Sequence, residues 1–183
     1  RQPVGADLRG VSLISPVTRM DRTIGMLVRL RVPIAPVRNL VPLTALMLQG
    51  VAVSDGSVAG LLDAGRSSRA KALWPQLQER SLEELCATDS FGALAPAGLF
   101  APGVAGSGLR AALLEWLRRE DIRHVTWPRA LPVRVDWGAF DEVAPSPVTA
   151  RLVRRWRQTG AEVLGKVWVA SHSTVLDERH APA

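Results

Sequence analysis

The chain has 183 residues, 47% of them apolar and 22% charged, and its 23 basic and 17 acidic side chains give a net charge of +6. This length suits one domain with a hydrophobic core and is too short for two ordinary ones. The single cysteine, Cys86, excludes an internal disulfide framework and a cysteine-rich zinc site. No stretch reaches the roughly 18 uncharged apolar residues of a membrane span.

The positive charge is concentrated at the start of the chain, where residues 1–40 hold seven arginines and two aspartates. These arginines are scattered among apolar residues, and no aromatic residue occurs before Trp74. Nucleic-acid binding favours a basic stripe with interleaved aromatics, so we expect a solvated arginine surface and no nucleic-acid partner. Residue 1 is Arg and no signal-peptide pattern follows it. We therefore expect a chain that starts inside a longer protein or after processing, in the cytoplasm.

Residues 1–40 form a predicted core strand region. A strand is expected at Leu8–Ser15, closed by Pro16, and the alternating run Ile24–Val32 fits a strand or the opening of a helix. Residues 41–108 form a predicted cap-like helical insertion. Its expected elements are helices at Ser57–Leu62 and Arg69–Cys86, a capping box at Ser81 and Glu84, and a loop over Ala93–Gly108.

Residues 109–183 form a predicted core βαβ region, and we expect the whole chain to be one structural domain. The expected elements are a helix at Leu109–Glu120, a short strand at Ile122–Trp127, a strand at Leu131–Trp137, a helix at Pro147–Thr159 capped by Ser146 and closed by Gly160, and a strand at Glu162–Val169. Strand, helix and strand with tight connections indicate a βαβ unit and hence a parallel sheet.

Asp141 and His172 come just after two strands that this pattern makes neighbours in the sheet. Catalytic groups of parallel α/β sheets gather at the carboxyl ends of the strands. A carboxylate there can accept the imidazole N–H and fix its tautomer, which leaves the other ring nitrogen to act as a general base. Asp141 and His172 are therefore the candidate catalytic residues. His180 is the second candidate histidine, and His124 is expected to be structural.

The segment around these two residues resembles the C-terminal part of the α/β-hydrolases. The resemblance covers about residues 130–180 and rests on Gly138-Ala139-Phe140-Asp141, Pro145, Leu152 with Trp156, Gly160-Ala161-Glu162 and Ser171-His172, where Ser171 replaces the glycine of the family. It implies an α/β fold with a parallel sheet flanked by helices and a helical cap-like insertion. It also implies a serine hydrolase acting on esters or thioesters, or an acyl transferase, with no cofactor.

The serine nucleophile of this family lies in a Gly-x-Ser-x-Gly turn, and the chain contains no such pentapeptide. Ser107, in Ala105-Gly106-Ser107-Gly108-Leu109, is the nearest match and lacks both outer glycines. Ala6–Val17 resembles the strand that follows the nucleophile helix in the family, so we expect the chain to lack the nucleophile elbow and the oxyanion hole. On this hypothesis the chain alone does not react with a fluorophosphonate probe. The Leu- and Ala-rich cap indicates an apolar acyl or ester substrate.

Two other functions stay open. The chain could be a non-catalytic α/β binding module, in which Asp141 and His172 are structural. It could also bind anionic partners through a basic surface on one predicted helix, at Arg151, Arg154, Arg155 and Arg157. We expect that helix to be a solvated flank with Trp156 in the core. Three scattered histidines and one cysteine give no metal-ligand spacing.

Overall fold

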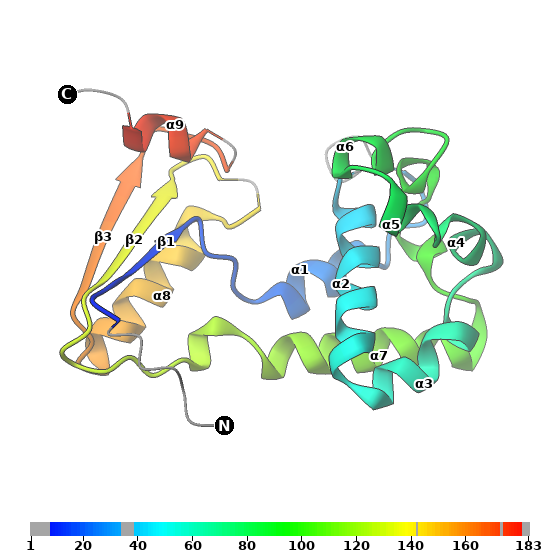
Figure 1. Ribbon diagram of the computed structural model, residues 1–183, viewed down its shortest axis with the longest axis horizontal. Coiled ribbons are helices and arrows are strands. Elements are labelled where there is room, and N and C mark those ends of the chain that lie inside the picture. The colour runs from blue at the N-terminus through cyan, green and yellow to red at the C-terminus, as the bar shows by residue number, and fades with distance from the viewer. Residues whose placement is uncertain (1–7, 34–38, 142, 173, 181–183) are drawn as a thin grey trace. The chain divides into compact units, whose positions relative to one another are not determined.

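The computed structural model describes residues 8–33, 39–141, 143–172 and 174–180. Its contacts divide the chain into two compact units (Figure 1). The first, which we call the sheet unit, consists of Thr18 and the residues before it, together with Asp121 and the residues after it. The second, the helical unit, is Arg19–Glu120. The helices of this second unit extend beyond the predicted insertion at 41–108 on both sides.

The sheet unit contains a three-stranded parallel sheet in the order β1-β2-β3. Its strands are β1 (Val11–Ile14), β2 (Val133–Gly138) and β3 (Val163–Trp168). Val133 of the central strand lies opposite Val11 on one side and Val163 on the other. The predicted α/β class with a parallel sheet is confirmed, and all three strands end at the same edge of the sheet.

Helix α8 (Ser146–Gln158) connects β2 to β3 and covers one face of the sheet. Leu152, Val153 and Trp156 are buried there against the side chains of β2, which confirms the core position of Trp156. Pro145, not Ser146, is the N-cap residue, and the Ser146 hydroxyl instead accepts a hydrogen bond from the Trp137 indole at 2.9 Å. Gly160 follows the helix with φ +87°, the left-handed conformation expected at a helix C-terminus.

The helical unit is built from short helices around its own core. They are α1 (Met20–Leu27), α2 (Leu40–Ser54), α3 (Gly56–Gly65), α4 (Ser68–Leu73), α5 (Gln76–Glu79), α6 (Leu82–Leu85), the 3-10 turns η2 (Phe91–Ala93) and η3 (Pro96–Leu99), and α7 (Gly103–Arg119). Helix α7 packs against α1 and α3. The centre of this core includes Leu48, Phe91, Leu109 and Leu113.

Several element predictions need correction. Of the two forms left open for Ile24–Val32, the structure has the helical one as far as Leu27, because helix α1 buries Ile24 and Leu27 on one helical face. The predicted helix Arg69–Cys86 is three short helices, interrupted near Pro75 and again at Ser81, where the predicted capping box with Glu84 is present. The loop predicted up to Gly108 ends earlier, because α7 begins at Gly103.

The predicted strand Ile122–Trp127 is also wrong. Residues Ile122–His124 form a 3-10 turn, η4, whose N-cap Asp121 accepts a hydrogen bond from the Arg123 backbone N–H. The strand predictions for Leu131–Trp137 and Glu162–Val169 are confirmed as β2 and β3. The chain ends, in its described part, with helix α9 (Val175–His180), which contacts β2 and β3.

Among the residues that the structure describes, no helix combines the length and the apolarity that crossing a lipid bilayer would require.

Candidate active site

The end of β2 is packed tightly against the segment that leaves β3. A Cβ atom placed on Gly138 would lie 2.3 Å from the carbonyl oxygen of Ala170, a distance that no side chain tolerates. The backbone N–H of Phe140 donates to the same carbonyl at 3.1 Å. The chain beyond Gly138 and the chain beyond Ala170 are therefore held side by side, which brings Asp141 and His172 to one place.

Asp141 is fixed by the backbone of its own turn. Its side chain is completely buried. Its Oδ1 atom accepts hydrogen bonds from the backbone N–H groups of Val143 at 3.0 Å and Ala144 at 2.6 Å. A carboxylate held by two backbone donors is fixed in one orientation.

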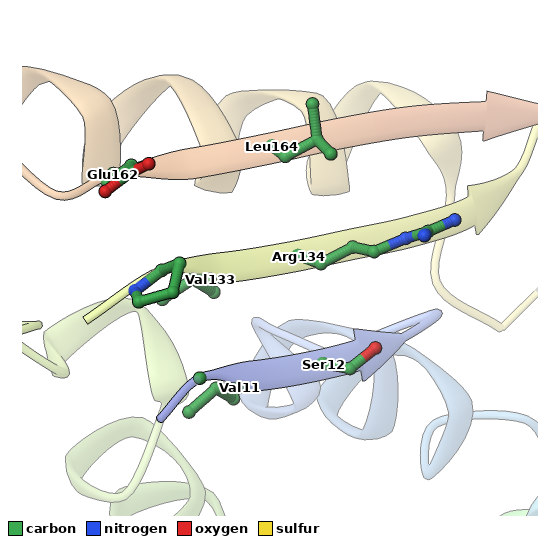
Figure 2. A pocket seen from close by; sticks show the side chains of 8 residues that line it. Val11, Ser12, Val133, Arg134, Glu162 and Leu164 are labelled. Carbon is green, nitrogen blue, oxygen red and sulfur yellow. The ribbon is translucent and has the colours of Figure 1, made fainter. Parts of the chain in front are cut away.

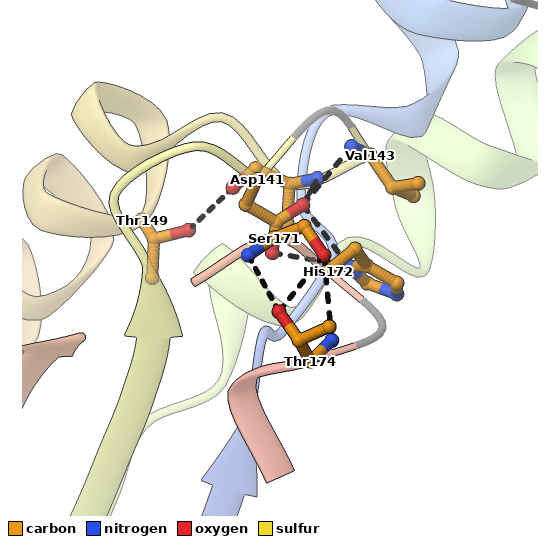
Figure 3. A network of polar contacts seen from close by, with 7 residues as sticks. Asp141, Val143, Thr149, Ser171, His172 and Thr174 are labelled. Atoms are coloured by element: carbon orange, nitrogen blue, oxygen red, sulfur yellow. Dashed lines mark hydrogen bonds and ion pairs between the residues drawn. The ribbon is translucent and has the colours of Figure 1, made fainter. Parts of the chain in front are cut away.

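His172 meets this carboxylate from the turn after β3. Its Nδ1 atom lies 3.0 Å from each of the two carboxylate oxygens of Asp141. Figure 3 shows this contact between the two side chains. The imidazole is 34% exposed, in contrast to the buried carboxylate. The structure thus brings the two predicted site residues into hydrogen-bond contact, with Nδ1–H as the donor when the ring is neutral.

The turn that carries His172 is stabilised by its neighbours. The Thr174 hydroxyl accepts a hydrogen bond from the Ser171 backbone N–H at 3.0 Å and lies 3.0 Å from the Ser171 hydroxyl. The Ser171 hydroxyl in turn accepts from the Thr174 N–H at 3.4 Å (Figure 3). These reciprocal bonds hold Ser171, which precedes His172, against Thr174.

This arrangement can do acid–base chemistry. A buried carboxylate that accepts Nδ1–H selects the tautomer in which the other nitrogen, Nε2, has a lone pair. The same carboxylate stabilises the imidazolium that forms when Nε2 takes up a proton. A partly exposed ring can exchange that proton with a reacting group, which is the requirement for a general base.

Ser107, the nearest match to the nucleophile motif, lies in a different compact unit from Asp141 and His172. It lies in the helical unit, within helix α7, and is exposed. The segment before it contains η3 and the N-cap Pro102, with no strand that would form an elbow. Gly106 is required by packing and not by a nucleophile turn, because a Cβ atom there would lie 1.8 Å from the Ala101 carbonyl oxygen. The Gly-Ser-Gly sequence is part of a closely packed helix start.

The two other histidines have different surroundings. His124 lies in η4, where its Nε2 accepts a hydrogen bond from the Arg123 guanidinium at 3.3 Å. His180 is the last residue of α9. The contact with Asp141 therefore distinguishes His172 from His124.

A second buried carboxylate, Asp136, was not singled out by the sequence. It lies in the middle of β2, fully buried, and forms a two-bond ion pair with Arg134 at 2.7 and 3.1 Å. It also accepts a hydrogen bond from the Trp168 indole at 2.9 Å. The available signal was the spacing of Arg134 and Asp136, which at i and i+2 in a strand share one face. This network links β2 to β3 and is satisfied without a ligand.

A hollow of about 430 Å³ lies over the opposite end of the sheet. Its lining comes from the first residues of the three strands, including Val11, Val133 and Leu164 (Figure 2). Asp141 and His172 follow the carboxyl ends of the strands, so this hollow is not part of their site. Within the described ranges, no group of three or more His, Cys, Asp or Glu side chains could hold a metal ion.

Comparison of the chain with models of protein families finds no match, and comparison with curated proteins also finds none.

Proposed function

We propose that Asp141 and His172 are the acid and the general base of a hydrolase of the serine α/β-hydrolase type, which cleaves an ester or thioester or transfers an acyl group. The observation that carries this proposal is the 3.0 Å contact of His172 Nδ1 with a completely buried Asp141 carboxylate. The position of this contact beyond the carboxyl ends of two adjacent parallel strands, β2 and β3, supports it further.

In this reaction, Nε2 of His172 takes the proton of a serine hydroxyl as that hydroxyl attacks the carbonyl carbon. Asp141 keeps the ring in the required tautomer and stabilises its charged form. His172 then returns the proton to the leaving group, and the acyl-serine formed is released by water or another acceptor. The serine and the oxyanion hole are not assigned to residues of this chain, and the proposed substrate is an apolar acyl compound or ester.

The proposal is tested by labelling the natural full-length protein with a fluorophosphonate probe, which reacts with an activated serine. We expect labelling of one serine, with a rate that falls by about 10³-fold or more in His172→Gln and strongly in Asp141→Asn. His124→Gln is the matched control and keeps the original rate.

Two results would overturn the proposal. One is an absence of labelling in a full-length protein that is correctly folded. The other is labelling that proceeds at the same rate in His172→Gln as in His124→Gln. Either result favours the alternative, a non-catalytic α/β binding module in which the Asp141–His172 contact only stabilises the turn.

A further inference from the structure

The helical unit contains two adjoining cavities that the proposed hydrolase chemistry does not use. They measure about 530 and 520 Å³, and both are lined by Ser107 and Arg110. Their other walls come from α1 and the residues after it, and from the segment that leads into α7. Helix α1 packs along α7 (Figure 1), and we call the two cavities together the α1–α7 groove.

The α1–α7 groove is lined by an unusual set of charges. Four arginines contribute to it, namely Arg22, Arg29, Arg31 and Arg110. Asp21 is the one carboxylate among the lining residues, and it belongs to the second cavity only. The hollow over the sheet, by contrast, is lined by one basic and one acidic residue, Arg134 and Glu162.

In the described part of the chain, no side-chain hydrogen bond or ion pair engages these four guanidinium groups. Elsewhere in the same unit arginines are paired, as Arg119 is with Asp55 and Arg80 with Asp89. Like charges gathered in a concave surface repel one another and focus a positive potential there. An anion in the groove would relieve this repulsion and supply the missing acceptors.

The size and lining of the groove indicate the kind of anion. Cavities of a few hundred Å³ suit small molecules. Guanidinium groups bind phosphate through paired hydrogen bonds, and four of them match more than one negative charge. Binding of single-stranded nucleic acid uses exposed aromatic rings for stacking, whereas the one aromatic residue in this lining, Phe100, is buried.

We propose that the α1–α7 groove binds a small molecule that carries a diphosphate group, through Arg31 and Arg110 in the first cavity and Arg22 and Arg29 in the second. The shared Ser107 hydroxyl is a further hydrogen-bonding group for it. Three of the seven arginines in residues 1–40 belong to this site. It is independent of the proposed reaction at Asp141 and His172.

The test is a titration of the ¹⁵N-labelled chain with sodium pyrophosphate at constant ionic strength, followed by amide chemical shifts. We expect saturable shifts at Gly103, Gly106, Ser107 and Arg110. The double variant Arg31→Gln with Arg110→Gln should bind at least about tenfold more weakly, since it loses two charge-assisted contacts.

The matched control is Arg69→Gln with Arg154→Gln, which removes the same charge from two exposed arginines outside the groove. It should bind pyrophosphate as the original chain does, and thermal unfolding verifies that both double variants are folded. Equal weakening in the two double variants, or shifts that do not saturate, would overturn the proposal. Tighter binding of a short DNA oligonucleotide than of pyrophosphate, lost in the Arg31 and Arg110 variant, would assign the groove to nucleic acid instead.

Discussion

At the scale of single residues, Gly138 determines whether the two halves of the candidate site can meet. The space that its side chain would occupy is filled by the carbonyl oxygen of Ala170. We expect Gly138→Ala to lower the free energy of unfolding by about 1–3 kcal/mol, as overpacking does elsewhere. Urea denaturation measures this change.

Gly108 provides the control for this substitution. It lies within α7, and a Cβ there would meet nothing within 4 Å. Because alanine is the better helix former, Gly108→Ala should raise the stability by about 0.5–1 kcal/mol. If both substitutions changed stability equally, the close approach of β2 to the residues after β3 would not exist.

A second residue-scale prediction concerns Asp55, the N-cap of α3. Its hydrogen bond from the Ser57 hydroxyl, followed by that from the Arg119 guanidinium, lowers its pKa from 3.8 to about 2. A carboxyl group whose pKa is lower in the folded state than in the unfolded state stabilises the fold at any pH above its unfolded-state pKa. This stabilisation is lost as the pH falls to the folded-state pKa. The contribution of Asp55 should therefore disappear between about pH 3.8 and pH 2.

The measurement is the melting temperature of the original chain and of Asp55→Asn across this pH range. The variant should melt at a lower temperature near neutral pH, and the difference should shrink toward pH 2. Asp177→Asn, which removes an exposed carboxylate without a described hydrogen bond, is the control. A difference between the original chain and Asp55→Asn that stays constant with pH would contradict the assigned role.

At the scale of the elements, helix α8 is the main support of the sheet. Leu152 on its inner face is 3% exposed. Leu152→Ala should lower the free energy of unfolding by about 2–5 kcal/mol, because the methyl groups removed leave a cavity against β2. Arg154→Ala on the outer face of the same helix should change it by less than about 0.5 kcal/mol.

Urea denaturation of the two variants distinguishes a packed helix from one that only connects two strands. Similar small effects from Leu152→Ala and Arg154→Ala would show that α8 does not cover the sheet as described.

The elements around α8 are also those that the sequence predicted best. In β2, α8 and β3, apolar residues recur at the spacing typical of the element, and a recognisable residue marks an end, such as Gly160 after the helix. The pattern of Ile24–Val32 fits both a strand and a helix, and the packing of Ile24 and Leu27 against the helical core selects the helix up to Leu27. Local periodicity could not reveal this tertiary preference.

The candidate site was predictable for a similar reason. Asp141 and His172 follow strands that are close in sequence, so one βαβ unit places both at the same edge of the sheet. The arginines of the α1–α7 groove come from α1, the residues after it and α7, about 80 residues apart in the sequence. Only the packing of α1 on α7 brings them together, so composition alone suggested a scattered basic surface.

At the scale of the whole molecule, the two compact units have separate hydrophobic cores. One core is made of residues between Met20 and Leu117, and the other of residues of the sheet, α8 and their neighbours. The helical unit is also continuous in sequence, as domains that fold alone often are. We therefore expect a polypeptide of residues 19–120 to fold without the rest of the chain.

Circular dichroism of this polypeptide should show a helical spectrum and a cooperative thermal transition. Leu113→Ala, at a fully buried position of the core, should lower the transition temperature. A spectrum of an unfolded chain would contradict the separation into two units.

The central claim, that Asp141 fixes the imidazole of His172 for proton transfer, is tested most directly by the side-chain nitrogen signals of His172. Long-range ¹H–¹⁵N correlation spectra, recorded where the ring is neutral, should show a protonated Nδ1 and an unprotonated Nε2. In Asp141→Asn this preference should be lost, while the signals of His124 stay unchanged. A protonated Nε2 in the original chain, or a tautomer that Asp141→Asn leaves unaltered, would contradict the account.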